Sequence, residues 1–420
     1  MKVSHFNTYL TGGAAIAARR LHDSLATRGV KSTFFSFTGE APNNTYISID
    51  QKESRSVTRK ANRYARNLCH LLRIHYHTRG RPEGYEPFSN SRLYWKTPLA
   101  MFDAHPDIVH LHWIANFLDY PSFFSSVPES VPIIWTLHDM NPFTGGCHYS
   151  WECRRYQSLC CNCPQLRKSS RSDLSTKNFL LKKETLRGKN LHVVADSRWL
   201  EREARTSPIF SEAKSIQTIH YGLDTQTFFP KDKGACRSVL GLAPDSIVIS
   251  FGADHVGNRR KGMPELLAAL SGIGSNDRLV LLLFGQSFPH LGQVDFPSIH
   301  FGFVQSPTLL SAIYSASDMF VIPSLHEAFG QTALESLACG TPVVGFRTGG
   351  IPDMIIHGET GLLAQPNDTN DLSAQIRWLM DHPEERRQMG LRGRLSVENM
   401  FTADMQADKY TSLYSYVLNS

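Results

Sequence analysis

Short apolar segments alternate with helix-forming segments along almost the whole chain, and this alternation constrains the fold more than any other feature of the sequence. Strands in the first half are expected at residues 2–7, 32–37, 108–113, 133–136 and 191–195. Strands in the second half are expected at residues 246–251, 279–284, 299–303, 319–322 and 342–346. Strands that alternate with helices predict parallel sheets with helices on both faces.

The length of 420 residues fits two to three domains at roughly 150 residues each. A short polar segment with a proline, Ser207–Lys214, is the expected boundary. We predict an α/β chain with two doubly wound, Rossmann-like domains, residues 1–210 and 211–400, which face each other across a ligand-binding cleft. The last helix, within residues 401–420, is expected to cross back to the first domain.

The composition is that of a globular protein, with 41% hydrophobic and 20% charged residues. A net charge of +6 suits an anionic small molecule or an anionic membrane surface better than nucleic acid. The longest apolar runs fall short of the ~20 residues that cross a bilayer, and residues 1–7 do not read as a signal peptide. The expected location is therefore cytoplasmic, including the inner face of the membrane.

Residues 323–342 carry the strongest signal for chemistry. A strand ends at Ile322, and a helix follows from about Gln331 until Gly340 ends it. The backbone N–H groups of Gly330, Gln331 and Thr332 would form an anion site at the start of this helix. Glu327 and Glu335 flank that site and could accept hydrogen bonds from sugar hydroxyls. The alternative is an ordinary helix with one solvated glutamate and one glutamate at the edge of the buried core.

Three weaker motifs also follow predicted strands. Arg259, Arg260 and Lys261 precede Gly262 and could neutralise a diphosphate, although charged loops are commonly just solvated. His138 closely follows the strand at 133–136 and is itself followed by an aspartate, which fits an active-site or a structural histidine. Gly12-Gly13 forms a tight loop but lacks the third glycine of the dinucleotide fingerprint.

Taken together, these motifs resemble the retaining glycosyltransferases of family 4, which have the GT-B architecture. Glu327 to Glu335 matches the E-x7-E motif of that family. The resemblance covers nearly the whole chain and is strongest over residues 216–363, which include Gly349-Gly350-Ile351-Pro352-Asp353 and the block at 358–363. Within that family, the chain resembles bacterial glycosyltransferases of polysaccharide biosynthesis.

The resemblance implies a donor site for a nucleotide diphosphate sugar. Glu327 would contact the transferred sugar, Glu335 the ribose and Lys261 the diphosphate. Backbone N–H groups would come from Phe329, Gly330, Gln331 and Thr332. Further expected contacts are those of His138 beside the sugar, Val304 at the nucleobase, and Gly12 and Gly13 in the first glycine loop. Glu327, His138 and Lys261 are the predicted catalytic residues.

Some positions depart from the family pattern. His255 stands where the family usually has its phosphate-binding arginine, so Arg259 or Arg260 would take over that role. Asp353 stands where a glutamate is more usual.

The predicted reaction transfers a sugar to a hydroxyl acceptor, such as a glycan or a lipid-linked glycan, with retained configuration. Fixed cations and the helix N-terminus would stabilise the leaving phosphate, so no catalytic metal is expected. Two alternatives remain open: a nucleotide-sugar epimerase or hydrolase of the same architecture, and a non-enzymatic binding protein stabilised by zinc.

An insertion at residues 140–165 holds five of the eight cysteines. Cys147, Cys153, Cys160 and Cys163 could supply the four thiolates of a structural zinc site. The irregular spacing matches no familiar zinc ribbon, so free thiols in a long loop are the alternative reading.

Residues 51–81 form a basic segment with nine Lys or Arg and a single acidic residue, Glu53. Tyr64, Leu68, Leu71 and Leu72 recur at helical spacing, which fits an amphipathic helix on anionic lipid or a helix with a solvated basic face. His110 and His112 share one face of their strand. They could approach the cleft, although a satisfied buried pair fits better.

Overall fold

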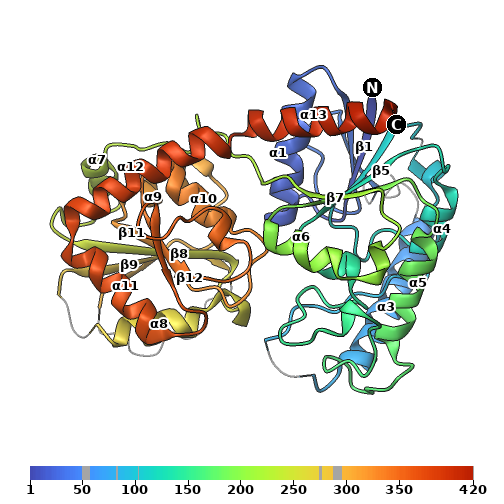
Figure 1. Cartoon of the computed structure of the whole chain (residues 1–420), viewed down its shortest axis with the longest axis horizontal. Helices are drawn as coiled ribbons and strands as arrows, with labels where there is room; N and C mark the ends of the chain where they lie inside the picture. Colours follow the sequence, from blue (N-terminus) through green and yellow to red (C-terminus); the bar gives the residue numbers. More distant parts are fainter. Residues whose placement is uncertain (50–56, 82–83, 103, 274–276, 287–295, 420) are drawn as a thin grey trace. The chain divides into compact units, whose positions relative to one another are not determined.

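The computed structural model describes residues 1–49, 57–81, 84–102, 104–273, 277–286 and 296–419 (Figure 1). The chain forms two compact units. The first contains residues 1–220 and 407–420, and the second contains residues 221–406. Each unit is described by itself.

The first unit is built on a parallel sheet of seven strands in the order β3-β2-β1-β4-β5-β6-β7. The strands are β1 (Lys2–Asn7), β2 (Lys31–Ser36), β3 (Tyr46–Ser48), β4 (Ile108–Leu111), β5 (Ile133–Leu137), β6 (Leu191–Ala195) and β7 (Ser215–Thr218). The strand order reverses between β1 and β4. In doubly wound sheets, ligands bind beyond the carboxyl ends of the strands at such a reversal.

The helices of the first unit are α1 (Gly13–Thr27), α3 (Val57–Thr78), α4 (Tyr120–Ser126), α5 (Leu174–Leu186), α6 (Arg198–Arg205) and α13 (Ala403–Asn419), the last belonging to it from residue 407 onward. Leu21 of α1 and Tyr410 of α13 share a core cluster with Val3 of β1, so both helices cover the same face of the sheet (Figure 1). The opposite face is aromatic, as shown by Phe6 packing against Phe123 of α4.

The second unit repeats the plan with a parallel sheet of six strands in the order β10-β9-β8-β11-β12-β13. The strands are β8 (Ile247–His255), β9 (Leu279–Gln286), β10 (Ser298–His300), β11 (Met319–Ile322), β12 (Val343–Phe346) and β13 (Gly361–Ala364). Here the order reverses between β8 and β11. The loops after these two strands are therefore the expected ligand loops.

The helices of the second unit are α7 (Lys233–Val239), α8 (Met263–Ser271), α9 (Pro307–Ala316), α10 (Gln331–Ala338), α11 (Thr369–Asp381) and α12 (Pro383–Met400). Leu266 of α8, Ile376 of α11 and Met389 of α12 join the core cluster that covers one face of the sheet. The apolar runs predicted as buried strands do lie in the core: Leu281, Leu282 and Leu283 have no exposed surface.

The prediction of two doubly wound parallel-sheet domains is confirmed, and the elements lie within a few residues of their expected bounds. The boundary between the units falls at residue 220 rather than at 207–214. The reason is β7, which was not predicted: it pairs with β6 and belongs to the first sheet. This strand has only four residues, three of them polar, and therefore gives no clear signal in the sequence. Among the described residues, no helix is long and apolar enough to cross a membrane.

Candidate functional site

Two loops of the second unit meet where the strand order reverses. The loop after β8 carries Arg260 and Lys261 in a short 3-10 turn, η5 (Arg259–Lys261), and the loop after β11 carries Glu327. Glu327 Oε2 lies 2.6 Å from Lys261 Nζ and 3.2 Å from Arg260 Nη1. Residues 66 positions apart in the sequence therefore form one ion-paired cluster.

The charge state of Glu327 follows from this cluster. Burial alone would raise the pKa of the Glu327 carboxyl, whose residue is only 8% exposed. Lys261 and Arg260 outweigh that effect and lower the pKa to about 2. Ser324 Oγ, 3.3 Å away, and the bond from Arg260 to the carbonyl of His326 complete the cluster. The carboxylate is ionised and held in place, as a hydrogen-bond acceptor for hydroxyl groups must be.

Two glycines allow these loops to approach each other. Gly262 has φ +76°, and a Cβ there would lie 1.7 Å from the carbonyl oxygen of Pro323. Gly349 has φ +54°, and a Cβ there would lie 1.9 Å from the carbonyl oxygen of Glu327. A side chain at either position would clash with the backbone of the Glu327 loop, so glycine is required in both the Lys-Gly and the Gly-Gly motif.

The helix α10 begins directly after the same loop. Its N-cap residue is Gly330, at φ 107°, and no side chain caps its first turn. Gln331 and Thr332, in that first turn, are half-buried, and Phe329 is buried with its ring 5.1 Å from that of Tyr221. An uncapped helix N-terminus presents N–H donors and a positive dipole end to an anion.

Glu335 lies in the second turn of α10 and is only 6% exposed. The hydroxyl of Tyr314, a buried residue of α9, donates to Glu335 Oε2 at 3.2 Å. Both glutamates of the E-x7-E motif are therefore buried and held by other side chains. The picture of a solvated surface glutamate does not fit either of them.

Other predicted donor-site residues lie around these loops. Arg259 forms a two-bond ion pair with Glu265 in the first turn of α8, whereas Arg260 is buried against Glu327. His255 is exposed at the end of β8, and Val304 is half-buried in the loop after β10. The cation that contacts the Glu327 carboxylate beside Lys261 is therefore Arg260. Which of the two arginines binds the phosphate stays a prediction.

The predicted residues of the first unit also lie at the carboxyl ends of its strands. Gly12, at φ 87°, is the N-cap of α1, and Gly13 begins that helix. His138 follows β5 and is 9% exposed, and burial lowers its pKa to about 4, so the ring is neutral near pH 7. The neighbouring Asp139 accepts hydrogen bonds from His148 and Trp113.

His110 and His112 are buried on the face of β4 that α1 and α13 cover. Sequence reasoning missed their neighbour His5, which pairs with His110 in the register of β1 and β4. Among the described residues, these three histidines form a group whose potential metal-ligand atoms lie within 4.8 Å of one another. The alternation Val3, His5 in β1 was the available signal, because it places His5 on the inner face.

The Cys cluster, defined as Cys147, Cys153, Cys160 and Cys163, consists of free thiols. Burial, followed by mutual repulsion, raises the pKa values of Cys147, Cys160 and Cys163 to about 12, and Cys153 contributes to all three shifts. The four thiols thus converge, although no three of their sulfurs lie within 4.8 Å of one another. The buried ammonium group of Lys182 has a smaller, opposing effect and lowers the pKa values of Cys147 and Cys160.

The basic segment is helical from Val57 to Thr78, and residues 51–56 and 82–83 lie outside the described residues. Leu68, Leu71, Leu72 and Tyr76 of α3 are 44–63% exposed. His70 is buried, and Ile74 packs against a small core cluster. Helix α3 therefore packs with one face and exposes an apolar stripe on another.

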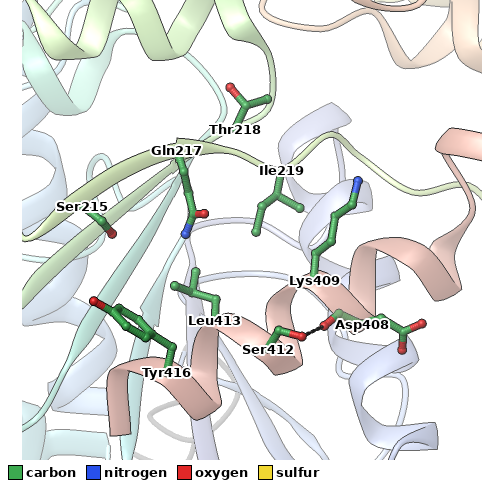
Figure 2. A pocket seen from close by; sticks show the side chains of 9 residues that line it. All are labelled: Ser215, Gln217, Thr218, Ile219, Asp408, Lys409, Ser412, Leu413 and Tyr416. Carbon is green, nitrogen blue, oxygen red and sulfur yellow. Dashed lines mark hydrogen bonds between the residues drawn. The ribbon is translucent and has the colours of Figure 1, made fainter. Parts of the chain in front are cut away.

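A pocket of about 560 Å³ lies elsewhere in the first unit, between the edge strand β7 and helix α13 (Figure 2). Gln217 and Ile219 line it from the β7 segment, and Lys409 and Tyr416 line it from α13. None of its lining residues belongs to a predicted site.

Comparison with known proteins finds a family match within the second unit. Residues 255–396 match the family model described as Glycosyl transferases group 1, and this range includes both the Lys261 and the Glu327 loops. The predicted resemblance to glycosyltransferases is thereby confirmed for this range. Whether the chain belongs to family 4 and retains configuration stays a prediction.

Curated relatives match over part of their length. N-acetyl-alpha-D-glucosaminyl L-malate synthase of Bacillus anthracis is 29% identical over 221 residues, which are 51% of this chain and 57% of the relative. D-inositol 3-phosphate glycosyltransferase of Rhodococcus erythropolis is 31% identical over 216 residues, which are 46% of this chain and 48% of the relative. The chain spans about half the length of the curated relatives it matches.

Solved structures with the same fold cover the whole chain. Sucrose-phosphate synthase from Thermosynechococcus elongatus has a TM-score of 0.69 at 20% identity and covers 100% of this chain and 99% of its own. HepE from Anabaena, solved with UDP-glucose, has a TM-score of 0.62 at 17% identity and covers 99% and 100%. WaaG, a glycosyltransferase involved in lipopolysaccharide biosynthesis, has a TM-score of 0.62 at 15% identity and covers 97% and 99%. The fold is therefore that of the GT-B glycosyltransferases.

Proposed function

We propose that this chain transfers a sugar from a nucleotide diphosphate sugar to a hydroxyl acceptor, with retention of configuration. The observation that carries the proposal is the ion-paired cluster of Glu327, Lys261 and Arg260 beside the uncapped N-terminus of α10. This cluster lies within the range that matches the glycosyltransferase family model. Paired charges and helix N–H groups suit a diphosphate, and a fixed carboxylate suits sugar hydroxyls.

Each residue has a distinct role in this proposal. Lys261 binds the diphosphate, and its ammonium group can contact Glu327 and a phosphate oxygen together because it has three donors. The first-turn N–H groups of α10 bind the same anion. Glu327 positions the sugar, Glu335 binds the ribose, and Val304 contacts the nucleobase. His138 and the Gly12-Gly13 loop act from the first unit.

The reaction exchanges one bond at the anomeric carbon for another. The acceptor oxygen bonds to that carbon while the bond to the β-phosphate oxygen breaks. The leaving phosphate accepts the acceptor's proton on the same face of the sugar. Lys261 and the N-terminus of α10 stabilise the charge that develops on the phosphate, so we propose that no catalytic metal takes part.

Nucleotide release from a donor panel, measured with and without acceptors, tests the proposal. UDP-sugars come first, because HepE was solved with UDP-glucose; ADP- and GDP-sugars follow. Transfer requires release that depends on the acceptor and a glycosylated product with an α-linkage from an α-configured donor. Glu327→Gln, which keeps the shape of the side chain, is the control. Equal release without acceptor favours the hydrolase alternative, and isomerised donor favours the epimerase.

We further propose that α3 binds an anionic membrane surface, which suits a lipid-linked acceptor in polysaccharide synthesis. Four large apolar or aromatic side chains of α3 are exposed, and the surrounding segment carries nine cations against one anion. Sedimentation with vesicles that contain anionic phospholipid should pull down the protein, and neutral vesicles should not. Leu71→Glu should abolish the binding, whereas Leu180→Glu, at an exposed leucine of α5, should not. Equal sedimentation of the two variants contradicts the proposal.

The Cys cluster is proposed as a structural zinc site. Four converging thiols supply the ligand set that zinc prefers, and a tetrathiolate site carries a net negative charge that the buried Lys182 would partly balance. Gly145 N–H also donates to Cys160 Sγ at 3.2 Å. Metal analysis of the purified protein should find about one zinc per chain, reduced in Cys163→Ser and unchanged in Cys161→Ser, the adjacent cysteine outside the cluster. A zinc content near zero rejects the site.

A further inference from the structure

The loop that carries Glu327 is held from both sides by the loops of the neighbouring strands. We define the Glu327 loop as residues 323–330, between β11 and α10. The sheet order β8-β11-β12 places it between the loop after β8, which carries Arg260 and Lys261, and the loop after β12, which carries Thr348. The β8 side provides the cations of the ion-paired cluster, whereas the β12 side holds the backbone of the Glu327 loop.

Three successive backbone carbonyls of the Glu327 loop accept hydrogen bonds from three different donors. The hydroxyl of Thr348 donates to the carbonyl of Leu325 at 3.0 Å. The N–H group of Gly350 donates to the carbonyl of Glu327 at 2.9 Å. The carbonyl between these two accepts from Arg260 on the β8 side at 2.7 Å. Two of the three donors therefore come from the loop after β12.

The register of the sheet explains why these loops meet. Ile322, the last residue of β11, pairs with Gly345 of β12. Leu325 and Thr348 each lie three residues beyond this pair, at the carboxyl edge of the sheet. Adjacent strands lie only about 4.8 Å apart, so a short side chain in one loop can reach the backbone of the next loop.

The side chain of Thr348 extends from a fixed backbone. The N–H group of Thr348 donates to the carbonyl of Phe346 at 2.9 Å. Its carbonyl accepts from the N–H group of Ile351, a fully buried residue, at 3.2 Å. Thr348 itself is half-buried, and its branched Cβ restricts rotation about χ1. The hydroxyl is therefore a fixed donor and not a mobile surface group.

We propose that Thr348 is a positioning residue for Glu327. Its hydroxyl holds the carbonyl of Leu325, two residues before Glu327, and thereby fixes the position of the carboxylate relative to the donor sugar. Lys261 and Arg260 hold the carboxylate itself, whereas Thr348 holds the backbone from which the side chain extends. The effect on sugar transfer rests on the proposed function, but the support of the loop does not.

A direct contact between Thr348 and the nucleotide diphosphate is the competing interpretation. A threonine hydroxyl has a single proton to donate, and Thr348 donates it to Leu325. A diphosphate offers only acceptors, so the hydroxyl could bind it only by giving up Leu325. A direct contact therefore predicts a change in nucleotide affinity, whereas positioning of Glu327 predicts a change in kcat at constant nucleotide affinity.

Two substitutions of Thr348 in the full chain form a matched pair. Thr348→Val keeps the shape of the side chain and removes the donor, so kcat should fall about tenfold, as expected from the loss of about one hydrogen bond. Thr348→Ser keeps the donor, and its kcat should stay within twofold of the wild type. The affinities for UDP, GDP and ADP, measured by calorimetry, should be unchanged in both variants.

Thr411→Val is the control for the loss of a threonine hydroxyl. Thr411 is a half-buried residue of α13 in the first unit, and its hydroxyl also donates to a backbone carbonyl, that of Ala407, at 2.8 Å. This variant should transfer sugar like the wild type. A fall in kcat equal to that of Thr348→Val would indicate a general loss of stability and overturn the proposal.

A double-mutant cycle tests whether Thr348 acts through Glu327. Once Glu327→Ala has removed the carboxylate, adding Thr348→Val should lower kcat less than twofold further, because no carboxylate remains to be positioned. A further tenfold fall in the double variant would overturn the proposal. A weaker nucleotide affinity of Thr348→Val, or equal kcat values of Thr348→Val and Thr348→Ser, would do the same.

Hydrogen–deuterium exchange resolved to single amides tests the support of the loop without activity. The N–H group of Leu325 donates to the carbonyl of Arg260 at 2.8 Å, and that of Gly350 donates to Glu327. Both amides should be protected in the wild-type protein, exchange faster in Thr348→Val and regain protection in Thr348→Ser.

Unprotected amides of Leu325 and Gly350 in the wild-type protein overturn the inference, even if a variant fails to fold. If exchange changes as expected but no sugar donor of the panel releases its nucleotide, the proposed function fails and the inference about the loop stands.

Discussion

Both strand-order reversals of this protein contain buried polar side chains. Among these are neutral histidines in the first unit and an ionised glutamate in the second. In the first unit, burial lowers the pKa values of His5, His110 and His112 well below their usual range and keeps the rings neutral. In the second unit, Glu327 is also buried but stays ionised, because Lys261 and Arg260 contact it. A buried polar group thus persists either as a neutral hydrogen-bonded ring or as a charge with its partners.

The largest expected effect is that acidification destabilises the first unit at a higher pH than the second. An unfolded histidine binds a proton near pH 6.5, whereas the buried rings of the first unit resist it, so that unit loses stability as the pH falls below 6.5. Each such ring costs about 1.4 kcal/mol per pH unit in this range. Glu327 stabilises the second unit above pH 4.5, and this contribution is lost as the pH falls toward 2.

Hydrogen–deuterium exchange, corrected for the intrinsic pH dependence of exchange, measures the pH range over which each unit loses stability. Peptides from β1, β4 and β5 should lose protection between pH 6.5 and 4.5, before those from β8 and β11. Glu327→Gln should flatten the pH dependence of the second unit only below pH 4.5. Loss of protection in both units over one pH range would break the comparison.

Replacing Glu327 tests the charged side of the comparison by function. Glu327→Ala removes the acceptor for the sugar hydroxyls, so turnover should fall about a thousandfold, while nucleotide diphosphate binding should stay nearly intact. Steady-state kinetics and calorimetry measure the two quantities on the same preparation, and retained binding shows that the variant is folded. Turnover like that of the wild type would refute the assignment of Glu327.

Replacing Lys261 should weaken nucleotide diphosphate binding more than replacing Glu327 does. Lys261→Ala removes one charge-assisted contact to the diphosphate and should weaken nucleotide diphosphate binding about 10- to 100-fold. Arg377→Ala is the matched control, because Arg377 is an exposed cation of α11 that donates to the carbonyl of Gly272 and belongs to no predicted site. Unchanged affinity of Lys261→Ala in calorimetry would count against the phosphate role.

The smallest expected effect comes from the neutral side. Tyr414→Phe removes the hydroxyl that lies 2.6 Å from His110 Nδ1, and the ring otherwise fits the same space. The free energy of unfolding should fall by about 1 kcal/mol, as for one neutral buried hydrogen bond. Urea unfolding measures this difference. A loss as large as that of a broken buried ion pair, about 3–5 kcal/mol, would show that the histidine side is not a set of neutral hydrogen bonds.

Most of the fold could be predicted from sequence because its signals are local. Long apolar runs such as Leu279–Phe284 must be buried on both faces, and helix ends at Gly29 and Gly340 follow from left-handed backbone conformations. The strands β3, β7 and β13 were missed. Each has only three or four residues, and their pairing with β2, β6 and β12 is what identifies them as strands. The boundary between the units depended on β7 and shifted with it.

The sequence by itself determined which residues were candidates for the site: Glu327 and Glu335 eight positions apart, a Lys-Gly pair after one strand and a His-Asp pair after another. Only the tertiary structure decided their partners. It selected Arg260 over Arg259 for the Glu327 carboxylate, and it joined His5 to His112 and His138 across three strands. The physical reason is that sequence spacing fixes neighbours along one strand or helix, whereas hydrogen bonds and ion pairs between strands depend on sheet order and register.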